Sequence, residues 1–243
     1  MQRAAPEGLH QAVLGAGLAG GVRFLRRRSI CEGVAVDQFY IGLHIPSQAW
    51  RFDLVCLSVN RVRGRASDVL VGFGDGSAIL DSGAFTEISR HGEYRQSVKQ
   101  YEREIEHLKW RIPLACAVSQ DYMCEDFIIK ITGLSVREHQ IRTISRYESL
   151  MDCNTGVYIL PVLQGFGPDD YRRHLDLYGD RLARGAWVGV GSVCKRNGNP
   201  EAVRRVLAGI AADRPDLRLH GFGLKKTALM HPPVRALLGT ADS

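Results

Sequence analysis

The sequence lacks the paired cysteines of small zinc-binding modules. Its six cysteines are Cys31, Cys56, Cys116, Cys124, Cys153 and Cys194. No two of them stand in C-x-x-C spacing, which excludes the zinc-ribbon and zinc-finger patterns. They are scattered through strand-like segments, as is usual for reduced thiols in the core of a cytoplasmic protein. We therefore expect a cytoplasmic protein without a metal site.

The sequence also has no apolar run long enough to span a bilayer, so we expect no membrane association. Acidic residues are not in excess, because 32 Lys and Arg against 26 Asp and Glu give a formal net charge of +6. This charge favours a polyanionic partner, and nucleic acid before a membrane, although many enzymes are equally basic. The chain has 243 residues, 45% of them hydrophobic, which suits one large domain in the size class of single α/β barrels.

The first 37 residues do not fit the rest of the chain. A G-x-G-x-x-G pattern spans residues 15–20, but only about three strand-like residues precede it and no nucleotide-binding sheet follows, so we expect no dinucleotide cofactor. The basic cluster at residues 26–28 follows the apolar stretch, whereas in a signal peptide it would precede it. We predict a loosely attached or partly disordered leader over residues 1–37 and one domain over residues 38–243.

From residue 38 onward, short apolar segments alternate with amphipathic helical patterns. The strand-like segments are residues 39–43, 54–59, 78–80, 114–119, 157–163, 186–190 and 217–221, with an eighth that residues 234–240 lead into. The helical patterns are residues 94–109, 135–151, 169–182 and 200–212, and a further helix is expected to begin near Thr86. Such alternation indicates βαβ units. We predict an α/β fold, a (β/α)₈ TIM-type barrel, with a doubly wound sheet as the alternative.

Polar and small residues follow the ends of these strands, and in a barrel they would meet at one rim. They are Asp81, Asp121, Gln164, Gly189, Gly191 and Asp242. Two carboxylates and an amide suit a planar heterocycle with donor and acceptor edges, and a third carboxylate could attack an anomeric carbon. Phe85, Tyr122 and Phe222 are placed to stack on such a ring. The alternative for each Asp is a helix cap or turn.

Six segments in order carry a family resemblance. They are DSGAF (81–85), AVSQDYMCE (117–125), PVLQGF (161–166), WVGVGSV (187–193), LHGFG (219–223) and TADS (240–243). Together they resemble the queuine/archaeosine tRNA-guanine transglycosylases, and more closely their DNA-acting relatives, the DpdA (DeoxyPurine in DNA protein A) family. The resemblance covers residues 39–243.

The resemblance implies a role for each strand-end residue. Asp242 matches the nucleophile, and Asp81 matches the general acid/base. Asp121 matches the carboxylate that reads the Watson–Crick edge of the purine, and Gln164 matches the amide that reads its carbonyl.

The implied reaction is base exchange in DNA. Guanine would leave as Asp242 attacks the deoxyribose, and a 7-deazaguanine base such as 7-cyano-7-deazaguanine would replace it, without a redox cofactor or ATP. The backbone at Gly189 and Gly191 would face the base. A base in duplex DNA must first be flipped out, or be opened by accessory DNA-modification proteins.

Basic residues near the expected rim are candidate contacts to DNA phosphates, with ordinary solvated charge as the alternative. They are Arg61, Arg63, Arg65, Lys195, Arg196, Lys225 and Lys226.

The chain departs from the resemblance in two ways. The tRNA enzymes carry a cysteine-rich zinc site that has no counterpart here, and the sequence stops at Ser243, so the barrel would lack the helix after strand eight. The abrupt end keeps open the alternative of a catalytically inactive nucleic-acid-binding barrel. A tRNA-guanine transglycosylase is a separate alternative within the same class of enzyme.

Overall fold

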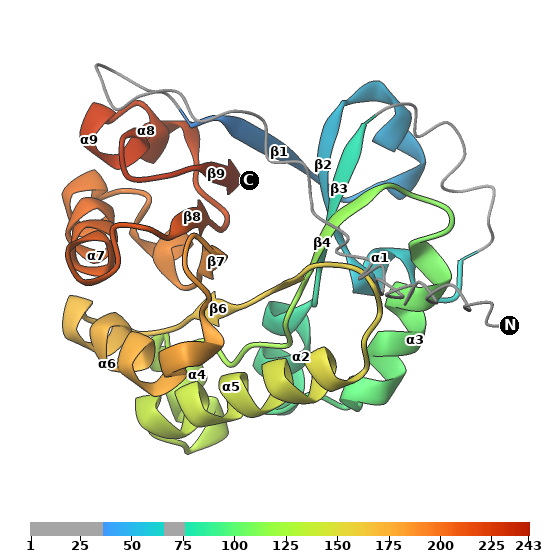
Figure 1. Cartoon of the computed structure of the whole chain (residues 1–243), viewed down its shortest axis with the longest axis horizontal. Coiled ribbons are helices and arrows are strands. Elements are labelled where there is room, and N and C mark those ends of the chain that lie inside the picture. Colours follow the sequence, from blue (N-terminus) through green and yellow to red (C-terminus); the bar gives the residue numbers. More distant parts are fainter. Residues whose placement is uncertain (1–35, 66–75) are drawn as a thin grey trace, which may run out of the picture. The chain divides into compact units, whose positions relative to one another are not determined.

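The computed structural model describes residues 36–65 and 76–243 (Figure 1). Nearly all of the predicted leader, with its glycine pattern, lies outside the described residues. The described part contains strands and helices in alternation along most of its length. The strands are β1 (Gln38–Leu43), β2 (Leu54–Ser58), β3 (Ser77–Asp81), β4 (Leu114–Val118), β5 (Ile159–Leu160), β6 (Val162–Leu163), β7 (Trp187–Val190), β8 (Arg218–Gly221) and β9 (Thr240–Asp242).

The strands form a ring of parallel neighbours. Their order is β5-β4-β3-β2-β1-β9-β8-β7-β6. β5 and β6 are two halves of one strand interrupted by Pro161, and the first half pairs with β4 while the second pairs with β7. The Gly189 N–H of β7 donates to the Pro161 carbonyl at 2.8 Å, so β7 stays hydrogen-bonded to this strand at the point where Pro161 interrupts it. The ring therefore has eight strand positions, and the predicted TIM-type α/β barrel is confirmed.

Helices follow most of the strands and pack around the outside of the ring (Figure 1). They are α1 (Val59–Val62), α2 (Ala84–His91), α3 (Val98–Leu108), α4 (Asp126–Thr132), α5 (Val136–Asp152), α6 (Pro168–Tyr178), α7 (Pro200–Asp213), α8 (Lys226–Leu229) and α9 (Pro232–Arg235). Short 3₁₀ helices are η1 (Pro46–Arg51), η3 (Gly179–Arg181) and η4 (Val193–Arg196). α3 and α5 each begin with a capping box, made by Ser97 with Gln100 and by Ser135 with Glu138. These reciprocal bonds satisfy backbone donors in the first turn and fix where each helix starts.

The strands are buried on both faces, as expected for a parallel sheet covered by helices. On β2, Val55 and Leu57 belong to the large cluster shared with α3 residues such as Ile105. Cys56, between them, belongs to a smaller cluster of mostly strand residues that includes Tyr40 and Trp187. Because side chains alternate along a strand, the smaller cluster fills the inside of the barrel and the larger one lies between strands and helices.

The last strand lies where it was predicted, and one helix boundary differs. Residues 234–240 lead into β9, which starts at Thr240, after the Pro232-Pro233 pair has begun the short helix α9. Proline suits a first helical turn because it has no N–H to donate. The helix predicted to reach residue 182 ends at Tyr178, where Gly179 turns the chain with φ of 50°.

None of the helices in the described ranges is both long and apolar enough to cross a membrane.

Candidate functional site

A cavity of about 480 Å³ opens at the carboxyl ends of the strands. Its walls include Asp81 from β3, Asp121 after β4, Gln164 after β6 and Asp242 from β9. These are the four polar side chains predicted to meet, although they come from segments far apart in the sequence. Gly191, after β7, also lines the cavity.

Asp81 is held by the tight turn that follows β3. Gly83 has φ of 74°, a conformation that favours glycine, and its N–H donates to Asp81 Oδ2 at 3.0 Å. A Cβ at Gly83 would lie 2.2 Å from Asn60 Nδ2, so the turn requires glycine for space as well. Burial, with a smaller contribution from the charge of Asp242, raises the pKa of Asp81 to about 6. Such a carboxyl can both release and accept a proton near neutral pH.

Asp121 lies at the centre of a polar network. Gln164 Nε2 donates to Asp121 Oδ2, and Ser82 Oγ donates to Oδ1 at 3.5 Å. Ser192 Oγ donates in turn to Gln164 Oε1 at 2.8 Å. Burial raises the pKa of Asp121 to about 7, and the nearby charges of Asp81 and Glu125 act in the same direction. The network therefore fixes both the carboxylate and the orientation of the Gln164 amide.

The backbone at Gln164 is anchored from two surrounding helices. Its N–H donates to His174 Nδ1 of α6 at 2.8 Å, and its carbonyl accepts from Gln140 Nε2 of α5 at 2.8 Å. Burial lowers the pKa of His174 to about 3, so the ring stays neutral and Nδ1 stays an acceptor. The helices thus position Gln164 from behind while its side chain faces the cavity.

Asp242 is oriented through one oxygen. The Gly223 N–H donates to Asp242 Oδ1 at 2.7 Å, and His220 Nε2 lies 3.5 Å from the same atom. On the other side of the ring, His220 Nδ1 lies 2.8 Å from Thr240 Oγ1, which accepts from Trp187 Nε1 at 2.8 Å. The threonine hydroxyl keeps its own proton to donate to Nδ1, and Nε2 on the other side of the ring faces the carboxylate. The Gly223 hydrogen bond fixes the position of Oδ1, while His220 Nε2 approaches the same oxygen without a hydrogen bond.

Several cavity residues were not predicted from the sequence. Glu125 is buried, burial raises its pKa, and its Oε2 has no hydrogen-bond partner among the described residues. Burial and the charges of Asp242 and Asp81 raise the pKa of the Cys56 thiol well above its usual range, so it stays protonated beside both carboxylates. Ser192 has φ of 59°, and a strained residue of this kind often marks a functional loop.

The predicted aromatic residues separate into two groups. Phe85 and Phe222 line the cavity. Tyr122 does not, because its ring is buried against Tyr94 and His139, with centroids 5.6 Å away in each case. The prediction that Tyr122 stacks on a bound ring is therefore not supported, and its neighbour Met123 reaches the cavity instead.

Gly189 also differs from the prediction that it faces a bound base. A Cβ there would lie 2.3 Å from Phe222 Cε2, so the Phe222 ring covers this glycine. Glycine at this position makes room for the aromatic wall of the cavity.

The predicted phosphate contacts separate in the same way. Arg61 and Lys195 line the cavity. Arg63 instead pairs with Glu104 at 3.7 Å and bonds to Asn60 and Gln96. These contacts occupy a guanidinium that was predicted to contact DNA.

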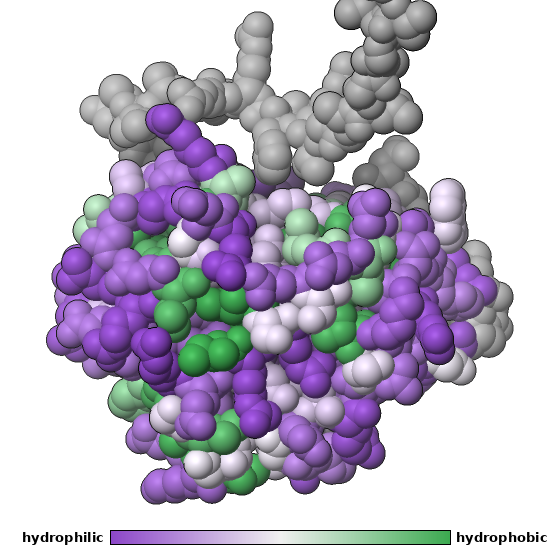
Figure 2. Space-filling model, turned by 60° about the horizontal axis from the view of Figure 1, so that its bottom comes forward, coloured by the Kyte–Doolittle hydropathy of each residue, from purple (hydrophilic) through white to green (hydrophobic). Residues whose placement is uncertain are grey.

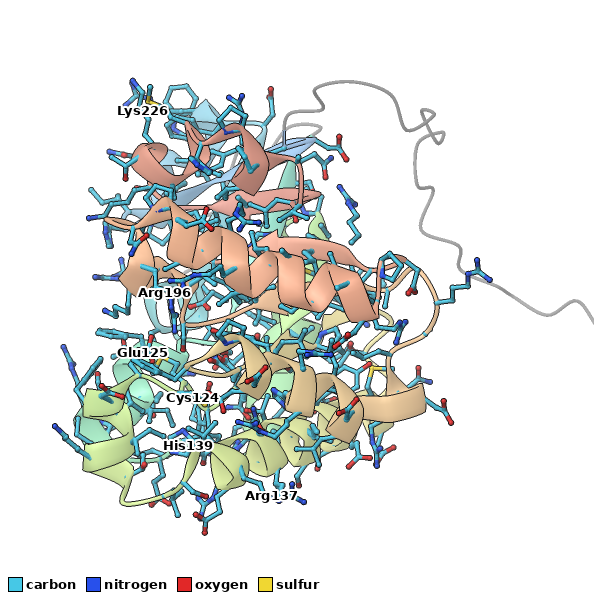
Figure 3. The ribbon with its side chains drawn as sticks, turned by 90° about the vertical axis from the view of Figure 1, so that its left-hand side faces the viewer. Cys124, Glu125, Arg137, His139, Arg196 and Lys226 are labelled. Carbon is cyan, nitrogen blue, oxygen red and sulfur yellow. The ribbon has the colours of Figure 1, made fainter. Side chains whose placement is uncertain are left out.

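Arg196 is likewise engaged within the chain, because it donates to the backbone carbonyls of Ser192 and Phe166. Lys225 and Lys226 are exposed at the start of α8, and Arg65 is exposed after α1. Figure 3 shows Lys226 well apart from Arg196 and from the segment that carries Cys124 and Glu125. These three exposed residues remain predicted phosphate contacts.

Within residues 36–65 and 76–243, no group of three or more His, Cys, Asp or Glu side chains could hold a metal ion. The five cysteines in these ranges are free thiols.

Comparison with known proteins identifies the family of this chain. A structural comparison finds similarity to the carboxyl transferase domain of pyruvate carboxylase from Rhizobium etli, solved with 3-bromopyruvate, at 9% identity and a TM-score of 0.43. The similarity covers 85% of this chain and 40% of that one. A comparison with curated proteins finds no match. The family model for DpdA, DeoxyPurine in DNA protein A, matches residues 35–243. The chain therefore belongs to the DpdA family.

Proposed function

We propose that this protein exchanges guanine in DNA for a 7-deazaguanine base through a covalent link between Asp242 and deoxyribose. The observation that carries the proposal is the cavity itself. It brings Asp242, Asp81, Asp121 and Gln164 to one rim, with a different hydrogen-bond environment for each. A nucleophile, an acid/base group and a pair of groups for reading a base are the parts that such a double displacement requires.

The first half-reaction breaks the glycosidic bond. The Asp242 carboxylate attacks the anomeric carbon as the bond from that carbon to guanine N9 breaks, and the electron pair of the bond stays on the base. Asp81 in its protonated form supplies a proton to the departing base. The Gly223 N–H holds Oδ1, with His220 beside the same oxygen, which keeps Asp242 oriented for attack.

The second half-reaction reverses these steps with a new base. Asp81, now ionised, accepts the N9 proton of the incoming 7-deazaguanine, whose nitrogen then attacks the anomeric carbon and displaces the Asp242 carboxylate. A group with a pKa of about 6 suits both directions of transfer. The exchange is balanced without a redox cofactor or a nucleoside triphosphate.

Asp121 and Gln164 would read the base. The ionised Asp121 carboxylate accepts hydrogen bonds from ring and exocyclic N–H groups. Gln164 Nε2 carries two protons, and Asp121 takes one of them, which leaves the other for the carbonyl of the purine. Because Ser192 holds Gln164 Oε1, the amide presents this donor in one orientation.

The decisive experiment uses a guanine-containing DNA oligonucleotide and a labelled 7-cyano-7-deazaguanine base. We expect wild-type protein to incorporate label and to form a DNA adduct that survives denaturation, with the adduct mapped to Asp242 by peptide mass spectrometry. Asp242→Ala should abolish both signals. Asp152→Asn, an exposed residue at the end of α5, is the matched carboxylate control and should behave as wild type.

The outcomes separate the alternatives. Adduct formation by the Asp242→Ala variant would refute the assigned nucleophile. Incorporation into tRNA but not into DNA would select the tRNA reaction. DNA binding with no exchange, in the presence of accessory proteins from the same host, would favour an inactive binding barrel.

A further inference from the structure

Three phenylalanines stand exposed on segments that follow neighbouring strands. Phe85 in α2, Phe127 in α4 and Phe166 between β6 and α6 are 50%, 40% and 48% exposed. Each lies a few residues beyond the carboxyl end of a strand, on the face of the barrel where the cavity opens. Other hydrophobic residues are exposed as well, among them Ile131, Ile141 and Met230, and Figure 2 shows several separate green patches on one face. The position of these three rings beside the cavity distinguishes them.

Two cations from η4 lie over these rings. Lys195 Nζ is 4.6 Å from the Phe85 ring centroid and 5.7 Å from that of Phe127. Arg196 Cζ is 5.2 Å from the Phe166 ring centroid. Phe85 and Phe127 also meet edge to face, with their centroids 6.2 Å apart. The two groups are joined through Lys195 and Arg196, which are adjacent residues of η4. We call these five side chains the aromatic rim, and two of them, Phe85 and Lys195, also line the cavity.

The aromatic rim is held in place by the cavity loops. Arg196 donates to the carbonyls of Ser192 and Phe166, which ties the loop after β7 to the loop after β6. Figure 3 shows Arg196 next to the segment that carries Glu125, which continues directly into α4 and Phe127. The rings are therefore presented on anchored segments, and little conformational entropy would be lost when a ligand stacks on them.

We propose that the aromatic rim binds unpaired nucleotides of DNA next to the base that enters the cavity. Ring faces at a cation-rich rim suit single strands, because every base has a face to stack and the cations attract phosphate. In a closed duplex the base faces are covered by one another. This inference rests on the proposed function, in which one base leaves the stack and its neighbours lose a stacking partner.

Carboxylates near the aromatic rim would repel a polyanion, and this gives a further prediction for DNA binding. Asp126 is exposed next to Phe127, and Asp169 is exposed close to Phe166. Glu125 is buried in the cavity wall. If DNA lies on the aromatic rim, Asp126→Asn should strengthen its binding, because the substitution removes a repulsive charge without removing a ring.

The test is a fluorescence anisotropy titration with a labelled oligothymidylate of about 12 nucleotides at about 50 mM salt. Oligothymidylate contains no guanine, so its binding does not require exchange. Phe127→Ala and Phe166→Ala should each weaken binding by about 5- to 150-fold, from the usual contribution of one stacked base. Phe127→Leu and Phe166→Leu keep apolar volume but lose the ring face, and they should also weaken binding if the variants fold.

Trp110→Ala is the matched control. Trp110 is 82% exposed and has Lys109 Nζ 5.5 Å from its ring centroid, so it offers the same chemistry. It lies after α3 and before β4, at the opposite end of the strands from the cavity. This variant should bind oligothymidylate as wild type does.

Two results would overturn the proposal: unchanged binding by the folded Phe127 and Phe166 variants, or an equal loss in Trp110→Ala. If unchanged DNA binding is accompanied by a changed sedimentation coefficient in the Phe variants, the rim is instead a protein interface. Exchange is measured separately from binding. Wild-type protein that binds oligothymidylate through the rim but never exchanges guanine refutes the proposed function and leaves this inference standing.

Discussion

Substitution of Asp121 by Asn should stabilise the fold in a pH-dependent manner. The raised pKa of Asp121, about 7 against an ordinary 3.8, means that the folded protein keeps this proton where the unfolded chain releases it. Between about pH 4 and pH 7 the unfolded state therefore binds fewer protons, and stability falls as pH rises. The amide of the Asp121→Asn variant has no proton to release in this range, so the variant should escape this loss.

The free energy of unfolding of wild type falls by about 4 kcal/mol over the full difference in pKa, at about 1.4 kcal/mol for each pH unit. Part of it is shared with Asp81, whose charge contributes to the raised pKa. We expect Asp121→Asn to gain about 2–4 kcal/mol relative to wild type between about pH 4.5 and pH 8. An amide of the same shape can still accept from Gln164 Nε2, so no buried partner is left without a bond.

The assay is urea unfolding followed by tryptophan fluorescence at about pH 4.5, 6 and 8, which spans the two ends of the titration. Asp152→Asn, at an exposed carboxylate, is the control and should follow wild type at all three pH values. If the Asp121→Asn and wild-type free energies of unfolding stay parallel across this range, the reasoning about a buried, proton-holding Asp121 is wrong. If Asp121→Asn is more stable than wild type but inactive, the carboxyl of Asp121 serves the function of the protein at a cost in folding stability.

Three further predictions concern the cavity. His220→Leu should lower the rate of exchange about tenfold through the lost contact to Asp242 Oδ1, while His220→Gln, which can place an N–H near the same oxygen, should retain more activity. Ser192→Ala should raise KM for the incoming base about tenfold with little change in kcat, because the Gln164 amide loses its fixed orientation. The kcat/KM for the incoming base should rise with pH through about 6, where Asp81 becomes ionised and able to accept a proton. A profile without that rise would exclude Asp81 as the base.

The barrel could be predicted from the sequence because its signals are local. Each strand is a short apolar run, and a helical pattern follows most of them, so β1 to β9 lie close to the predicted segments. The carboxyl ends of the strands then placed Asp81, Asp121, Gln164 and Asp242 at one rim without knowledge of any contact. Because neighbouring strands of the barrel run parallel, residues at their carboxyl ends gather at the same rim.

The contacts beyond the strand ends could not be predicted in this way. Side-chain alternation stops where a strand stops, so nothing local indicated that Tyr122 turns into the core while Met123 faces the cavity. Arg63 is occupied by Glu104, which lies on another helix much further along the chain. The Phe222 ring on Gly189 likewise joins two segments that are separate in the sequence. These pairings depend on tertiary geometry.

The charges around the cavity argue for catalysis over passive binding of a nucleic acid. Asp81, Asp121, Glu125 and Asp242 all line one cavity, and burial raises the pKa of the first three. Each buried carboxyl costs stability, and together they would repel phosphate. A surface that only bound DNA would gain nothing from them. Under the proposed function, a base and its sugar would enter among these carboxyls, while the phosphates would pass the edge of the cavity, where Lys195 belongs to both the cavity wall and the aromatic rim.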